Sequence, residues 1–160
     1  MSHARDVLLD QLLANANDKS WYVPFSESVK DLKEEEAFWK ISEDSNSIAE
    51  IVQHLLYWNT TWQTRYQESS VHAVSSVESN QSTFIVPKDT TFIELQEQLL
   101  KVLLQWQELL TKAQLDGDVL EFAGSKWWQV VANVTTHNAY HIGQIVYIRK
   151  IQKNWVRAYE

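Results

Sequence analysis

Two histidines on one predicted helix are well placed for metal chemistry. His137 and His141 are four residues apart, so in an α-helix they lie one turn apart on the same face, where two imidazoles can bind one ion together. A buried polar group without a partner costs about 1–3 kcal/mol, so each buried imidazole needs a partner. One shared metal ion would satisfy both. The pair falls within an otherwise apolar stripe, which predicts a core-facing helix over about residues 126–152. The stripe consists of Val130, Val134, His137, His141, Ile145 and Ile148.

A third nitrogen ligand is predicted at His54, the remaining histidine in a strongly predicted core-facing helix. That helix begins at Ser47, which forms a capping-box pattern with Glu50. Two facing helices that supply one and two histidines leave part of the coordination sphere open, as in catalytic rather than structural zinc sites. The apolar stripe that follows the cap consists of Ile48, Ile51, Leu55, Trp58 and Trp62.

Four long amphipathic helices are predicted to position these residues. The first covers about residues 5–17, the second begins at 47, the third begins near 91 with another capping-box pattern, and the fourth covers about 126–152. A short amphipathic piece follows Pro24, and residues 69–90 form a polar connection. With only three glycines and two prolines, the chain is predicted to be all-α, a single four-helix-bundle domain over residues 1–160.

Composition narrows the classes of partner and compartment. The net charge of −7 disfavours binding to nucleic acid and to anionic membranes. The absence of cysteine excludes disulfides, thiolate ligands and a cysteine nucleophile, and it suits a reducing compartment. We therefore expect a cytoplasmic protein with no nucleic-acid or membrane partner.

The two histidine-bearing segments resemble the signature helices of the DinB/YfiT-like family. Residues 47–59, SIAEIVQHLLYWN, carry a lone histidine in mid-helix, and residues 137–150, HNAYHIGQIVYIRK, carry H-x-x-x-H followed by Gly-Gln. The resemblance implies an up-down-down-up four-helix bundle, often a homodimer, in which His54, His137 and His141 bind a divalent metal. In this family the metal is most often nickel or zinc; iron, manganese and copper also remain open for three imidazole ligands. Characterised relatives include bacillithiol-dependent S-transferases and mycothiol-dependent isomerases.

A divalent cation with an open coordination position can lower the pKa of a bound water or thiol into the physiological range. Since the chain has no cysteine, the thiol implied by the resemblance would be a cosubstrate, bacillithiol-like, that is transferred to an electrophilic small molecule. The hypothesis is thus a metal-dependent thiol S-transferase. A metal-dependent hydrolase, a non-catalytic metal-binding or stress-related bundle, and three ordinary histidines without a metal stay open as alternatives.

Other residues are candidates for the surroundings of the metal. Glu50 precedes His54 by one turn, although its capping role already explains it, and Gln144 follows His141 by three residues. Trp58, Trp62 and Tyr140 could form the walls of a dry pocket for an apolar substrate, although core packing would explain them as well. No residue is assigned as the general base.

Overall fold

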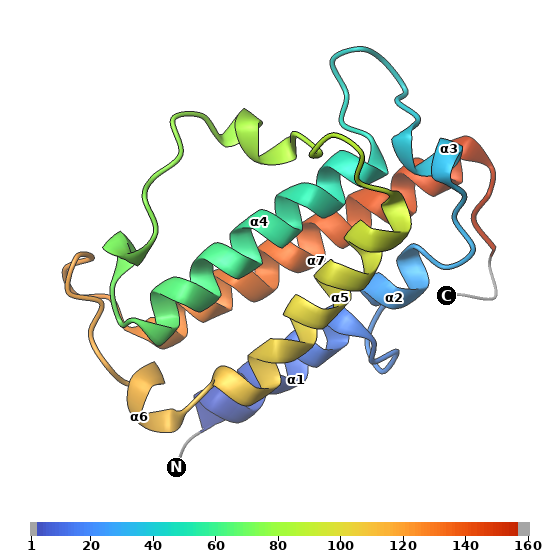
Figure 1. The fold of residues 1–160 in the computed structure, drawn as a ribbon. Helices are drawn as coiled ribbons and strands as arrows, with labels where there is room; N and C mark the ends of the chain where they lie inside the picture. The colour runs from blue at the N-terminus through green and yellow to red at the C-terminus, as the bar shows by residue number, and fades with distance from the viewer. Residues whose placement is uncertain (1–2, 157–160) are drawn as a thin grey trace.

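The computed structural model describes residues 3–156, and within that range it contains helices and connections but no strand. The prediction of an all-α fold is therefore confirmed. Four long helices, α1, α4, α5 and α7, lie alongside one another in Figure 1, with short helices between them. The elements are α1 (His3–Ala16), α2 (Phe25–Ser28), α3 (Glu34–Phe38), α4 (Ile48–Gln67), the 3₁₀ turns η1 (Val71–Ala73) and η2 (Asn80–Phe84), α5 (Phe92–Leu109), α6 (Lys112–Leu115) and α7 (Trp127–Gln152).

The helices begin where side chains satisfy their first backbone groups. The Ser47 backbone N–H donates to Glu50 Oε2 at 2.7 Å, and the Glu50 N–H donates to Ser47 Oγ at 3.2 Å. Thr91 and Glu94 repeat this reciprocal pair at the start of α5. Each box satisfies donors that have no partner within the helix, so the starts of α4 and α5 follow directly from local sequence.

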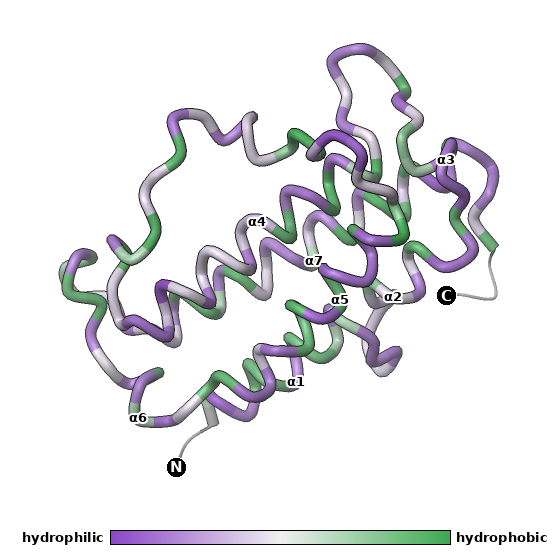
Figure 2. Tube along the Cα trace, viewed as in Figure 1, coloured by the Kyte–Doolittle hydropathy of each residue, from purple (hydrophilic) through white to green (hydrophobic). Residues whose placement is uncertain are grey.

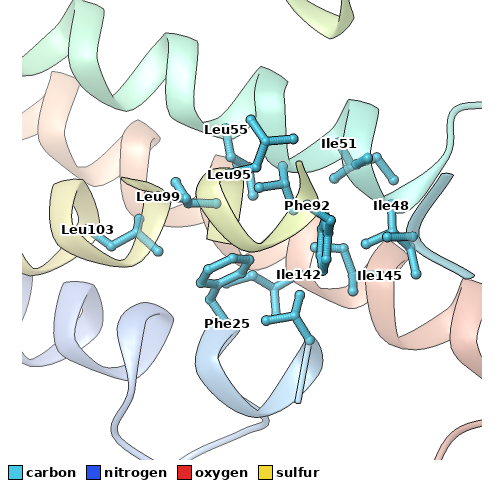
Figure 3. Packing of buried hydrophobic residues seen from close by; sticks show 14 of the residues in the cluster. Phe25, Ile48, Ile51, Leu55, Phe92, Leu95, Leu99, Leu103, Ile142 and Ile145 are labelled. Atoms are coloured by element: carbon cyan, nitrogen blue, oxygen red, sulfur yellow. The ribbon is translucent and has the colours of Figure 1, made fainter. Parts of the chain in front are cut away.

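The long helices close a ring in which α4 packs on α5 and α7, and α1 packs on α5 and α7. Figure 3 shows side chains of α4, α5, α7 and Phe25 from α2 converging in one buried cluster. A second cluster lies toward the other end of the helices and includes Leu12, Trp106 and Trp127. Hydrophobic and hydrophilic residues alternate along the helices (Figure 2). Within the described part of the chain, no helix is long and apolar enough to cross a membrane.

A buried amide pair joins α4 to α7 between the two clusters. Asn59 Nδ2 donates to Asn138 Oδ1 at 2.7 Å, and Asn59 Oδ1 accepts from Asn138 Nδ2 at 3.1 Å and from Trp106 Nε1 at 3.0 Å. Both asparagines are fully buried. Because the two reciprocal amide hydrogen bonds form only when Asn59 and Asn138 lie opposite each other, the pair fixes the register of α4 against α7.

The buried face of α7 is displaced from the predicted stripe. The most buried line includes Val131, Asn138, Ile142 and Arg149, whereas Val130, His137 and Ile148 are half-buried. Periodicity could not fix the centre of this face, because apolar residues occupy neighbouring positions and because an arginine and an asparagine take buried places. As a result, His137 lies at the edge of the bundle interior rather than at its centre.

Replacing Asn59 with alanine should lower the free energy of unfolding by about 2–4 kcal/mol, because Trp106 Nε1 and the Asn138 amide lose buried partners. Urea denaturation followed by circular dichroism measures this. Thr60→Ala on the exposed neighbouring position is the matched control and should change little. Equal stability of the two variants would contradict the structural role of the amide pair.

Candidate metal centre

Helices α4 and α7 bring three histidines to one point. One ring nitrogen from each of His54, His137 and His141 lies within 4.8 Å of the others. His54 Nε2 and His137 Nε2 are 3.0 Å apart. Figure 1 shows α4 and α7 running side by side, which is what places residues 83 positions apart in the chain at hydrogen-bond distance.

This donor set fits a divalent transition metal. Nitrogens bound to one ion at about 2.0–2.1 Å and at angles of about 90–110° are about 3.0–3.4 Å apart. The 3.0 Å separation of His54 Nε2 and His137 Nε2 suits a shared ion, and the His141 nitrogen lies within 4.8 Å of both. Neutral imidazole is a favoured ligand of zinc, nickel, iron and copper. Three protein nitrogens also leave room for a further ligand, since tetrahedral or octahedral coordination is then incomplete.

Thr83 holds His54 in the tautomer that a metal needs. The Thr83 hydroxyl donates to the Asn80 carbonyl at 2.6 Å. Its oxygen therefore accepts from His54 Nδ1–H, also at 2.6 Å, which leaves the Nε2 lone pair directed toward the other histidines. The Phe84 ring stacks on His54 with a centroid separation of 3.9 Å and fixes its plane.

Gln144 holds His141 in the same way. Gln144 Oε1 accepts from His141 Nδ1–H at 2.6 Å, so that His141 also offers its Nε2 lone pair. Such partners fix ring orientation and raise the basicity of a metal-binding histidine. Two of the three rings are therefore oriented by the protein itself before any ion binds.

The site keeps its imidazoles neutral. Burial, with repulsion from His141 and His137, lowers the pKa of His54 to about 3. Burial and repulsion from His141 lower the pKa of His137 to about 4. Burial also lowers the pKa of His141, against an opposing hydrogen bond to Gln144. At neutral pH the three nitrogens are therefore available to a cation without prior loss of a proton.

The metal-free protein should lose stability as the pH falls from about 6.5 to 5. Histidines in the unfolded chain protonate near their ordinary pKa of about 6.5, whereas His54 and His137 in the folded protein do so only near 3 and 4. Below about pH 6.5 the unfolded chain binds more protons than the folded protein does. The free energy of unfolding therefore falls as the pH falls. Thermal unfolding midpoints of chelator-treated protein measure the decline.

The doubly substituted His54→Gln, His137→Gln protein provides the comparison for that experiment. Glutamine does not titrate, so the midpoint of this variant should fall less steeply over the same pH range. A decline as steep as that of the unsubstituted protein would show that other groups cause the acid sensitivity.

A cavity of about 660 Å³ opens beside the three histidines. Trp58 and Trp62 from α4, and Tyr140 from α7, form part of its wall. Trp58 Nε1 donates to Asn80 Oδ1 at 3.2 Å, which ties the wall to η2. The open side of the histidine cluster therefore faces a space large enough for a small molecule.

Comparison with known protein families agrees with this arrangement. The family model of the DinB superfamily matches residues 9–145. The chain belongs to the DinB superfamily. The matched range contains all three clustered histidines, so the resemblance predicted from the two helical segments is confirmed. No curated protein and no solved structure matches the chain significantly.

Glu50 and Gln144, the two polar candidates near the ligands, have different surroundings in this DinB-superfamily chain. Glu50 forms the helix cap with Ser47, and its Oε1 lies 2.7 Å from Lys40 Nζ. Its carboxylate is engaged at the end of α4 and does not line the cavity. Gln144, in contrast, contacts His141 directly.

Sequence reasoning missed the part of the site that comes from the 69–90 connection. Asn80, Thr83 and Phe84 all belong to η2, which packs against α4. Thr83 and Phe84 are buried although the surrounding segment is polar. The apolar triplet of residues 84–86, FIV, in a Ser- and Asn-rich run was the available signal, and nothing in that run indicated which helix it would contact.

Proposed function

We propose that this DinB-superfamily chain is a divalent-metal-dependent enzyme that transfers a low-molecular-weight thiol, bacillithiol-like, to an electrophilic small molecule. The observation that carries the proposal is the position of the three histidine nitrogens at the wall of the 660 Å³ cavity. His54, His137 and His141 are the proposed ligands. Nickel and zinc are the proposed ions, with iron, manganese and copper as alternatives.

The bound cation would supply a Lewis acid that makes a thiol or water more acidic. The chain's own residues supply the rest. Thr83 and Gln144 hold two imidazoles in the ligating tautomer, and Trp58 and Trp62 supply apolar wall beside the reacting groups. Overall, the S–H proton passes to solvent, a carbon–sulfur bond forms, and the bond from that carbon to the leaving group breaks with its electron pair.

The site favours this reaction over the alternatives. Metalloproteases of the H-E-x-x-H type use a glutamate as general base, and the cavity-lining residues of the 3–156 range include neither aspartate nor glutamate. A purely structural ion is normally enclosed by four protein ligands, whereas within the described residues the cluster offers three and adjoins a cavity. Thiol transfer needs an activated external nucleophile and space for an acceptor, both of which suit this arrangement.

We also propose that the chain is a single domain with the up-down-down-up order of helices, that it forms a homodimer, and that it acts in the cytoplasm. Contacts of α1 with the end of α5 support the helix order: Arg5 Nε donates to the Leu110 carbonyl, and Gln107 Nε2 donates to the Leu9 carbonyl. The histidine pairing of α4 with α7, together with the contact of Asn15 Nδ2 with the Thr135 carbonyl, supports the placement of α7.

The proposal is tested by loading chelator-treated protein with nickel or zinc and measuring the loss of free thiol in the presence of an electrophile such as 1-chloro-2,4-dinitrobenzene. Thiol and electrophile should be consumed one to one, and faster with metal-loaded protein than with metal-free protein or without protein. Equal rates for metal-loaded and metal-free protein, across a panel of thiols and electrophiles, would overturn it.

A further inference from the structure

The cavity beside the histidines is built without charged side chains. Among the described residues, its walls contain no aspartate, glutamate, lysine or arginine. The nearest cations in sequence have other partners: Arg65 lies over the Trp62 ring at 4.8 Å and donates to the Val74 carbonyl, and Lys126 Nζ lies 2.8 Å from Asp118 Oδ1. A ligand inside the cavity would therefore find no ionic partner apart from an ion held by the histidines.

The walls are instead aromatic and aliphatic with a few neutral amides. Trp58, Trp62, Phe84 and Phe122 contribute rings, and Val130 and Val134 contribute aliphatic surface. Neutral hydrogen-bonding groups come from Asn80, Ser125, Gln129 and Asn133. This combination of apolar walls with a few amides is typical of sites for drug-sized molecules, and 660 Å³ lies within their usual volume of about 300–1,000 Å³.

We infer that the cavity binds an uncharged small molecule with an aromatic or other apolar body, whose polar or electrophilic end faces the three histidines. A carboxylate or ammonium placed among these walls would lose its hydration without gaining a partner, whereas an apolar body gains by leaving water. The role of this molecule as the acceptor of the thiol rests on the proposed function. A thiol with an anionic handle would keep that handle outside the cavity.

The test compares three probes that differ in charge but hardly in shape: 2-naphthamide, 2-naphthoate and 2-naphthamidinium. Their affinities for the chelator-treated protein are measured by calorimetry, so that no metal ion attracts the anion. We expect the neutral amide to bind at least tenfold more tightly than either charged probe. Equal or tighter binding of a charged probe, or no binding of any probe, would overturn the inference.

A charge introduced into the wall shows whether binding occurs in this cavity. Asn133 is exposed and lines the cavity, so Asn133→Lys should raise the affinity for 2-naphthoate severalfold and leave that for 2-naphthamide nearly unchanged. Thr136→Lys adds the same charge at an exposed α7 position outside the lining and should leave both affinities unchanged. The same effect from both lysines would place binding elsewhere and overturn the inference.

These outcomes separate the inference from the proposed function. If the neutral probe binds in the cavity but metal-loaded protein consumes no thiol with any electrophile, the transferase proposal fails and the inference on ligand charge stands. If metal-loaded protein turns over but the chelator-treated protein prefers 2-naphthoate, the inference fails and the transferase proposal stands.

Discussion

Replacing His137 with alanine should abolish stoichiometric metal binding. Loss of a hydrogen-bond partner behind a metal-binding histidine costs about 10–100-fold in affinity, so loss of a ligand should cost more than about 100-fold. His137 is half-buried at the edge of the bundle, and its nitrogen lies 3.0 Å from His54 Nε2. Because His137 is half-buried rather than part of the core, we expect most of the helical content to remain. Elemental analysis after dialysis and far-ultraviolet circular dichroism measure the two effects.

The matched control for His137→Ala is Thr136→Ala. Thr136 is exposed on the same turn of α7, and its hydroxyl donates to the Ala132 carbonyl of its own helix. This variant should bind one metal ion per chain, like the unsubstituted protein. Retention of one ion per chain by His137→Ala after dialysis would show that the assignment of ligands is wrong.

Thr83→Val should weaken metal binding by about 10–100-fold while leaving the ligands themselves intact. Valine has nearly the shape of threonine but cannot accept the hydrogen bond from His54 Nδ1–H, so the ring loses the contact that fixes its tautomer. Competition with a chromophoric chelator measures the affinity. Nitrogen-15 chemical shifts of His54 in the metal-free protein should show a larger share of the Nδ1-unprotonated tautomer.

Ser82→Ala is the control for this prediction because it removes a neighbouring hydroxyl from the same turn. Ser82 is exposed and its hydroxyl donates to the Ser79 carbonyl, away from the histidines. Loss of affinity in Ser82→Ala equal to that in Thr83→Val would mean that the turn as a whole, rather than the hydrogen bond to His54, supports the site.

The fold was largely predictable because its signals are local. Capping boxes at Ser47 and Thr91 mark the starts of α4 and α5 within one residue, and apolar periodicity shows that both helices are amphipathic. The centre of the buried face of α7 was not predictable, because Asn138 and Arg149 are buried through partners on other elements. Such partners depend on the tertiary arrangement, which periodicity does not encode.

The convergence of the histidines was predictable for a similar reason, and the groups that orient them were predictable only in part. The i, i+4 spacing of His137 and His141 requires a shared face whatever the packing. Gln144 lies three residues beyond His141, so its contact with that ring is also local. Thr83, however, reaches His54 across 29 residues through an irregular connection, and no spacing rule relates the two.

The central claim is that one divalent ion binds to the three histidines with an open side toward the cavity. Its most direct test is a crystal structure of the nickel- or zinc-loaded protein with anomalous diffraction measured at the absorption edge of the metal. We expect one anomalous peak about 2.0–2.1 Å from a nitrogen of each of His54, His137 and His141, with a non-protein ligand on the cavity side. A peak bound elsewhere, or one enclosed by four protein ligands, would contradict this account.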